Sequence, residues 1–114
     1  MKIKQENFTL MSGRVTMRSG HYNPTSDAVW LAAMAPRGVR TVLDVGVGSG
    51  GVSLCLWANN RDVQITGIDN SPEMLDACKT NMALNNLDAE LLNADIMTWR
   101  TSRTFDLVIT NPPY

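Results

Sequence analysis

Apolar residues recur along this chain with two alternating spacings, which together predict its secondary structure. Short runs rich in β-branched residues are separated by longer segments whose apolar side chains return every three or four positions. The first spacing is typical of buried strands and the second of amphipathic helices. We expect strands at residues 41–45, 63–69, 90–95 and 105–110, and helices at residues 26–34, 52–58 and 72–85.

The third expected helix has the clearest beginning. Ser71 can accept a hydrogen bond from an N–H of the first turn, and Pro72 loses no hydrogen bond at the first helical position. Strands that alternate with helices in this way indicate βαβ crossovers and a parallel sheet with both faces covered. The sequence therefore predicts an α/β fold in which residues 1–114 form a single unit.

Charge is distributed unevenly along the 114 residues. Residues 1–40 hold six basic and two acidic side chains, whereas residues 41–114 hold four basic and nine acidic ones, for a net charge of −1. We expect residues 1–25 to form a basic N-terminal lead segment. A basic surface of this size is compatible with phosphate contacts, but it does not identify a substrate.

Several classes of protein are disfavoured by the sequence. No apolar run exceeds seven residues and the N-terminus lacks the apolar block of a signal peptide, so we expect a cytoplasmic protein without membrane contact. Cys55 and Cys78 each lie inside an apolar helical pattern and form no cluster with His21, the single histidine. We interpret both cysteines as reduced core residues and expect no metal site.

A glycine-rich turn follows the first expected strand. Glycines in such a turn let the backbone approach a ligand, and the next helix presents its positive end to that ligand. Gly46, Gly48 and Gly51 match the dinucleotide pattern GxGxxG, and Asp69 ends the next strand, where a ribose hydroxyl would bind. On these residues alone, an NAD-dependent oxidoreductase stays open.

Asp44 separates this turn from a dinucleotide site, because a carboxylate beside the turn favours a cationic ligand over a diphosphate. The stretch Asp44-Val45-Gly46-Val47-Gly48-Ser49-Gly50 resembles the DxGxGxG loop of S-adenosylmethionine-dependent methyltransferases. The resemblance implies S-adenosyl-L-methionine as the cofactor and Asp44 as the acid that holds its methionine part. It also assigns cofactor binding to Val45, Gly46, Gly48 and Gly50.

Further acids follow the next two expected strands. Asp69, with Asn70 after it, ends the second strand, and its carboxylate offers only acceptors, as ribose hydroxyls require. Asp95 and Ile96 follow the third strand; the resemblance implies that the acid accepts from the adenine amino group and that the isoleucine covers the ring. With Asp44, these acids lie at the carboxyl ends of parallel strands, where open α/β sheets bind ligands.

The last four residues, Asn111-Pro112-Pro113-Tyr114, resemble the [DNS]PP[YFW] motif of amino-methyltransferases. The resemblance implies that these four residues are catalytic. Asn111 and the carbonyl of Pro112 would accept the two hydrogens of a planar amino group and stabilise the positive charge that grows on its nitrogen. The two prolines fix φ, and Tyr114 would stack on a planar substrate.

Residues 21–31 resemble the segment before the cofactor loop in bacterial methyltransferases that modify the 6-amino group of adenine in valine tRNA. This resemblance covers about residues 12–114 and implies tRNA as the substrate. Relatives commonly have a basic residue after the aromatic one, where this chain has Asn23 after Tyr22. A phosphate contact at that position is therefore not implied.

The same resemblance implies a Rossmann-like class I methyltransferase fold, whose seven-stranded sheet usually has the order 3-2-1-4-5-7-6. Four strands are expected here, in the order 3-2-1-4, so we expect the cofactor half of a longer enzyme. The fourth strand would be an open edge, and we expect it to pair with another chain, including a second copy.

Three other functions stay open on the sequence. The same half-site occurs in enzymes that methylate the glutamine amide of release factors, which is also planar. A partial chain can also serve as a cofactor-binding or dimerising module without catalysis. An NAD-dependent oxidoreductase is opposed by Asp44 and by residues 111–114.

Overall fold

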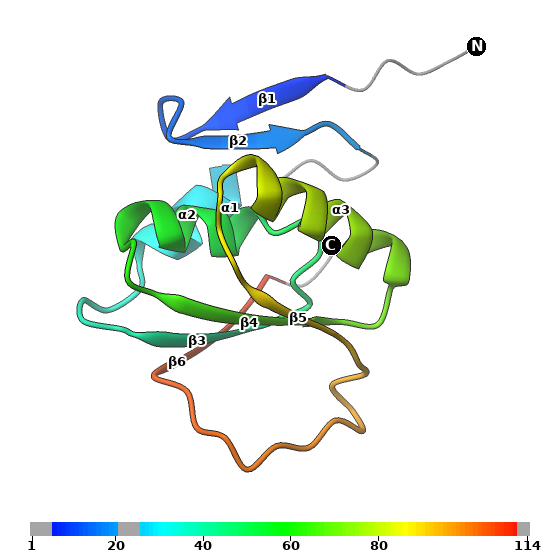
Figure 1. The fold of residues 1–114 in the computed structure, drawn as a ribbon. Coiled ribbons are helices and arrows are strands. Elements are labelled where there is room, and N and C mark those ends of the chain that lie inside the picture. Colours follow the sequence, from blue (N-terminus) through cyan, green and yellow to red (C-terminus); the bar gives the residue numbers. More distant parts are fainter. Residues whose placement is uncertain (1–5, 21–25, 112–114) are drawn as a thin grey trace.

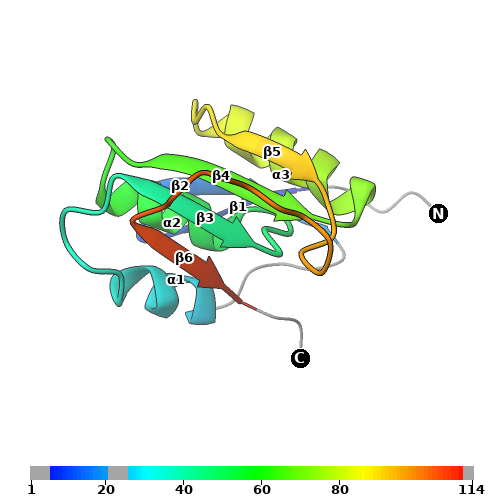
Figure 2. The same cartoon turned by 90° about the horizontal axis from the view of Figure 1, so that it is seen from below.

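The computed structural model describes residues 6–20 and 26–111 (Figure 1). Its centre is a four-stranded parallel sheet in the order β5-β4-β3-β6, which confirms the expected order. Figure 2 shows these strands side by side with their arrowheads at the same edge. The strands are β3 (Thr41–Val45), β4 (Gln64–Asp69), β5 (Glu90–Asn93) and β6 (Leu107–Thr110).

Three helices pack on one face of this sheet (Figure 1). They are α1 (Ser26–Ala33), α2 (Gly51–Asn59) and α3 (Pro72–Leu84), each within one residue of the expected bounds at either end. The predicted cap of α3 is confirmed, since the Met74 N–H donates to Ser71 Oγ at 3.3 Å. The core between helices and sheet includes Val42, Leu54, Ile65, Leu75 and Ile109.

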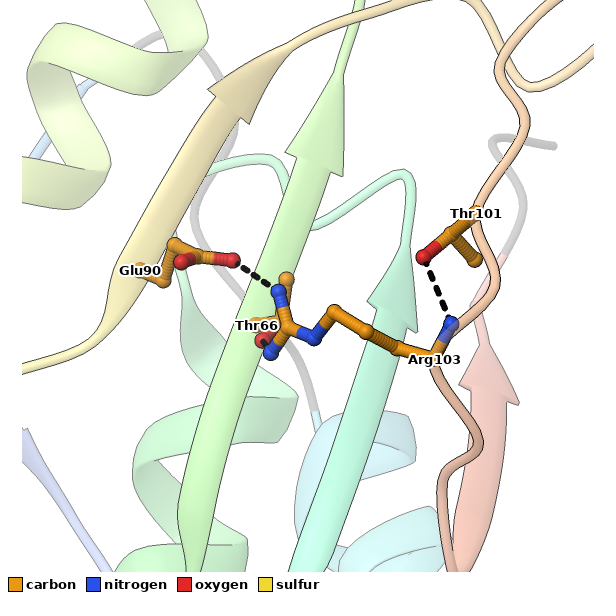
Figure 3. A network of polar contacts seen from close by, with 4 residues as sticks. All are labelled: Thr66, Glu90, Thr101 and Arg103. Carbon is orange, nitrogen blue, oxygen red and sulfur yellow. Dashed lines mark hydrogen bonds and ion pairs between the residues drawn. The ribbon is translucent and has the colours of Figure 1, made fainter.

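The opposite face of the sheet carries no helix in the described residues and is crossed by the connection 94–106 (Figure 1). Arg103 anchors this connection: its Nη1 donates to Glu90 Oε1 at 2.6 Å and its Nη2 to Thr66 Oγ1 at 3.1 Å (Figure 3). We expected both faces to be covered. In the described part of the chain, the second face has only this extended cover, because the stretch rich in Thr, Ser and Arg lacks the apolar period of a helix.

An antiparallel hairpin of β1 (Asn7–Leu10) and β2 (Val15–Arg18) lies outside the helix layer (Figure 1). We did not predict this hairpin, which falls inside the expected lead segment 1–25. Val15 and Met17 are completely buried and belong to the core, whereas Arg18 is exposed. The alternation of apolar and polar residues on both sides of a Ser-Gly turn is the signal that could have identified it.

Cys55 and Cys78 are buried and unpaired, which confirms their interpretation as reduced core residues. Burial raises the pKa of Cys55 to about 11 and that of Cys78 to about 12, so both thiols stay protonated near neutral pH. Within residues 6–20 and 26–111, no group of three His, Cys, Asp or Glu side chains is placed to hold a metal ion. No helix in these ranges has the length and apolar character needed to cross a membrane.

Candidate functional site

The carboxyl ends of the four parallel strands bring the candidate site residues to one edge of the sheet. Val45 pairs with Ile68 of β4 and with Thr110 of β6, and Asp69 pairs with Asn93 of β5. The carboxyl ends of the four strands therefore lie at nearly the same level in the sheet. The candidate residues that follow directly after these ends are Gly46, Gly48 and Gly50 after β3, Asn70 after β4, Asp95 and Ile96 after β5, and Asn111 after β6.

The glycine turn has one side open and one side closed. Gly46 and Gly50 have φ angles of +72° and +95°, in the left-handed region that other residues rarely adopt. A Cβ placed on Gly50 would lie 2.9 Å from Met82 Cε and 3.0 Å from Cys78 Sγ, so this glycine faces the core. A Cβ on Gly46 would meet nothing within 4 Å, so the open side of the turn lies there.

The backbone amides of the turn donate mostly within the protein. The N–H groups of Gly46 and Val47 both donate to the Ile68 carbonyl, at 2.8 and 3.0 Å. The Gly48 N–H donates to Asp69 Oδ2 at 2.9 Å, and the Gly50 N–H donates to the Val47 carbonyl at 3.0 Å. A diphosphate is normally held by such amides, so a turn that uses four of them internally is poorly suited to it.

Asp44 lies beneath the turn and is only 2% exposed. Ser53 Oγ donates to Asp44 Oδ2 at 2.5 Å, from the first turn of α2. Burial raises the pKa of Asp44 to about 6, an effect that the Ser53 hydrogen bond opposes and the nearby Asp69 carboxylate reinforces. Ser53 was not predicted, although it is a polar residue inside an otherwise apolar helical run.

Asp69 lies at the end of β4 and is partly exposed. Its Oδ2 accepts from Gly48 and its Oδ1 accepts from the Ser71 N–H at 2.9 Å, so the carboxylate joins the glycine turn to the start of α3. A carboxylate has about four acceptor positions, which leaves capacity for hydroxyl donors of a ligand. Asn70, the next residue, is exposed.

The remaining predicted residues lie along the same edge. Asp95 is exposed, and its Oδ1 accepts from the Met97 N–H at 2.9 Å, which fixes the turn after β5. Ile96 in that turn is 47% exposed and presents an apolar surface. Asn111 is partly buried after β6, while Pro112, Pro113 and Tyr114 lie outside the described residues.

A second residue that was not predicted, Asn81 of α3, also reaches the turn. Its Nδ2 donates to the Ser49 carbonyl at 2.9 Å, and its Oδ1 accepts from the Arg18 N–H of β2 at 2.8 Å. The side chain is 1% exposed and lines a groove of about 640 Å³ that Arg18 and Ser71 also border. The signal in the sequence is an asparagine next to the apolar positions of an amphipathic helix.

The sequence of this chain matches one protein family and is similar to several known proteins. The model of the methyltransferase small domain family matches residues 23–114. The tRNA1(Val) (adenine(37)-N6)-methyltransferase of Glaesserella parasuis serovar 5 (strain SH0165) is 34% identical over 97 residues, which are 78% of this chain and 39% of that protein. The release factor glutamine methyltransferase of Deinococcus radiodurans is 33% identical over 106 residues, which are 89% of this chain and 38% of that protein.

Solved structures have the same fold. The structure of coclaurine N-methyltransferase bound to N-methylheliamine and SAH superposes with a TM-score of 0.61 at 26% identity, covering 68% of this chain and 23% of that one. The chain thus spans roughly two fifths of the length of the two curated relatives. In each of these three proteins the matched region is less than half of the chain.

Proposed function

Because the chain belongs to the methyltransferase small domain family, we propose that it binds S-adenosyl-L-methionine at the carboxyl edge of its sheet and serves methyl transfer to a planar amino group. The observation that carries this proposal is the contact between Gly48 and Asp69. It sets a partly exposed carboxylate beside a glycine turn whose Gly46 side is open. Such a site combines acceptors for ribose hydroxyls with close backbone approach.

The charge of this edge supports a cationic cofactor. Asp44 is the penultimate residue of β3, Asp69 ends β4, and Asp95 follows β5. S-adenosyl-L-methionine supplies a methyl group on a positively charged sulfur, which negative charge at the edge stabilises. Asp44 is buried, so in this proposal it contributes its charge from beneath the turn instead of contacting solvent. A diphosphate is disfavoured by the same acids and by the internally bonded turn amides.

Asn111 is the proposed acceptor for the amino group of the substrate. It follows Thr110, which pairs with Val45, the residue before the glycine turn. An acceptor beside the methyl donor can hold an amino hydrogen and stabilise the charge that grows on nitrogen. Residues 112–114 would complete this acceptor site and the stacking surface, as their motif implies.

For the substrate we propose the 6-amino group of adenine in tRNA. The relative from Glaesserella parasuis bears the name of such an enzyme and matches 78% of this chain. The hairpin adds a specific observation, since Arg14 and Arg18 are exposed on it and carry positive charge suited to a phosphate backbone.

A glutamine amide of a release factor is the second candidate. The relative from Deinococcus radiodurans is almost equally identical and matches a larger share of the chain, 89%. The amide nitrogen of a glutamine side chain is also planar, and its two hydrogens need the same two acceptors.

Calorimetric titration with S-adenosyl-L-methionine tests the cofactor. NAD is the control ligand, and the variant Asp44→Ala removes the buried carboxylate. We expect the wild-type chain to bind S-adenosyl-L-methionine but not NAD, and we expect Asp44→Ala to lose the binding of S-adenosyl-L-methionine. Preferential binding of NAD would overturn the proposal.

Transfer of a labelled methyl group to tRNA and to a release factor then tests the substrate. Label recovered as 6-methyladenosine supports the tRNA proposal, and label recovered as methylglutamine supports the second candidate. Cofactor binding without transfer to either would indicate a binding module without catalysis.

We also propose that β6 mediates self-association. In the described part of the chain it pairs with β3 alone, and Val108 on it is 60% exposed. An exposed edge strand readily pairs with another strand. Sedimentation should show a dimer that Val108→Lys converts to a monomer, and a monomeric wild-type chain at high concentration would contradict this.

A further inference from the structure

Two asparagines, Asn81 within α3 and Asn85 at its C-terminal cap, hold the outer edge of the hairpin. Asn85 Nδ2 donates to the Thr16 carbonyl at 2.7 Å, and its Oδ1 accepts from the Thr16 N–H at 2.9 Å. Asn81 Oδ1 accepts from the Arg18 N–H at 2.8 Å. These amides satisfy backbone groups that point away from the partner strand β1. The hairpin is therefore attached to α3 by side-chain hydrogen bonds as well as by apolar packing.

The two asparagines differ in where their N–H groups donate. The Asn85 amide donates to Thr16 and to the Asn81 carbonyl, at 2.7 Å each, and so stays within the hairpin and its own helix. The Asn81 amide donates to the Ser49 carbonyl in the glycine turn, at 2.9 Å. Since Asn81 is 1% exposed, water does not compete for these bonds. One buried side chain thus joins the hairpin, α3 and the turn.

A turn of this composition needs such external contacts. Glycine-rich backbone has many accessible conformations when unrestrained, and each contact that removes them lowers the entropy that a ligand must otherwise remove on binding. Ser49 lies between Gly48, which is bound by Asp69, and Gly50, which precedes α2. A contact to the Ser49 carbonyl therefore fixes the middle of the turn.

We propose that Asn81 is a positioning residue for the cofactor: it fixes the glycine turn through its hydrogen bond to the Ser49 carbonyl. The effect on cofactor affinity rests on the proposed function. The effect on the turn itself does not, because the hydrogen bonds exist in the chain without a ligand.

The matched variants Asn81→Asp and Asn85→Asp separate positioning from stability. Each retains an oxygen that accepts from a β2 amide and loses the donor, at about pH 8 where a carboxylate carries no proton. In Asn81→Asp the lost donor served the turn, and in Asn85→Asp it served the hairpin. S-adenosylhomocysteine is the ligand to titrate, because its neutral sulfur avoids direct attraction to the new carboxylate.

Hydrogen exchange of the turn amides without ligand is the first readout, and the amides of the central strand β4, which is not part of the hairpin, are the internal reference. The amides to follow are those of Gly46, Val47, Gly48 and Gly50. We expect Asn81→Asp to accelerate their exchange about tenfold and to weaken S-adenosylhomocysteine binding about tenfold, as the loss of one buried hydrogen bond implies. Asn85→Asp should lower the melting temperature, while the exchange rates of the turn amides and the affinity for S-adenosylhomocysteine stay within about twofold of wild type.

Equal changes in turn exchange for the two variants would overturn the proposal, because Asn81 would then act on stability alone. If an aspartate variant does not fold, Asn81→Ala and Asn85→Ala form the second pair: both lose the acceptor for a β2 amide, and only Asn81→Ala also loses the donor to the Ser49 carbonyl. If the wild-type chain binds no S-adenosylhomocysteine, the proposed function fails for this chain, while the exchange rates still decide whether Asn81 positions the turn.

Discussion

The backbone N–H of Gly48 donates to Asp69 Oδ2 at 2.9 Å across 21 positions of sequence. This bond joins the turn after β3 to the end of β4, and the second oxygen of Asp69 joins β4 to the start of α3. The acid that is proposed to hold the cofactor ribose is thus also the residue that connects the two halves of the site. The shape and the charge of the site are set by the same side chain.

Replacing Asp69 should therefore affect binding more than folding. In Asp69→Asn the amide keeps one oxygen as an acceptor, so one backbone N–H stays bonded while the charge and the remaining acceptor positions are lost. We expect S-adenosyl-L-methionine affinity to fall by about 10- to 100-fold, as for the loss of charged hydrogen bonds. Calorimetry measures this, with the exposed Asp62→Asn as a control of unchanged affinity; equal losses in the two variants would refute the assignment.

Asp44→Asn should stabilise the chain at neutral pH. Because the folded state raises the pKa of Asp44 to about 6, it binds this proton more tightly than the unfolded chain, so stability falls as pH rises from about 4 to about 6. An asparagine still accepts from Ser53 but carries no charge, and should regain about 3 kcal/mol well above pH 6. Thermal melts across this pH range measure the difference.

Asp106→Asn is the control of opposite sign for those melts. Asp106 Oδ2 accepts from the N–H groups of Arg40 and Thr41, which lower the pKa of this carboxyl. Its stabilisation is present above the unfolded pKa and lost as pH falls, so its removal should lower the melting temperature at neutral pH. If Asp44→Asn behaved like Asp106→Asn, Asp44 would not be a destabilising buried charge.

The preference for a cationic cofactor should depend on pH through Asp44. A bound sulfonium favours the ionised carboxylate, so the affinity for S-adenosyl-L-methionine relative to S-adenosylhomocysteine should rise severalfold from about pH 5 to about pH 7. Both ligands share the same amino and carboxyl groups, so their ratio isolates the sulfur charge. The ratio should be flat with pH in Asp44→Asn, and a slope retained there would show that Asp44 is not the group responsible.

Two glycines of the turn should respond differently to alanine. Gly50→Ala adds close contacts with Met82 and Cys78 to the strain of positive φ, and should destabilise by about 2–4 kcal/mol. Gly46→Ala meets no protein atom, so it should cost only about 1–2 kcal/mol and act mainly by obstructing the cofactor.

Gly38→Ala serves as the matched control, since Gly38 has φ +80° with nothing near its Cβ and lies before β3. Urea titrations and cofactor binding of the three variants give the comparison. Cofactor binding by Gly46→Ala equal to that of Gly38→Ala would show that the open side of the turn is not the ligand side.

Arg103 should matter more to stability than the ion pair it forms. Glu90→Gln removes a half-exposed charge and should cost less than about 1 kcal/mol. Arg103→Ala also removes the bond to the buried Thr66 hydroxyl and the packing over Phe105, at 5.2 Å from the ring centroid, and should cost about 1–3 kcal/mol. Denaturant unfolding distinguishes them, and equal effects would place all of the stabilisation in the ion pair.

The sequence by itself determined the parallel sheet and the gathering of Asp44, Asp69, Asp95 and Asn111 at one edge, while the strand order followed from the resemblance of the glycine loop to that of class I methyltransferases. Apolar periodicity is a local property, and parallel strands connected by crossovers must end at the same edge. The capping of α3 by Ser71 was also readable, because a cap acts over three residues.

Only the tertiary structure decided that Asp44 is buried against Ser53, that the hairpin packs on α3, and that Asn81 reaches from α3 to both Arg18 and Ser49. Each of these contacts joins groups whose partners are set by how helices and strands pack together. A single asparagine in a helix has the same local propensity wherever it points. Its partners, 32 and 63 positions away, follow from packing that no local spacing encodes.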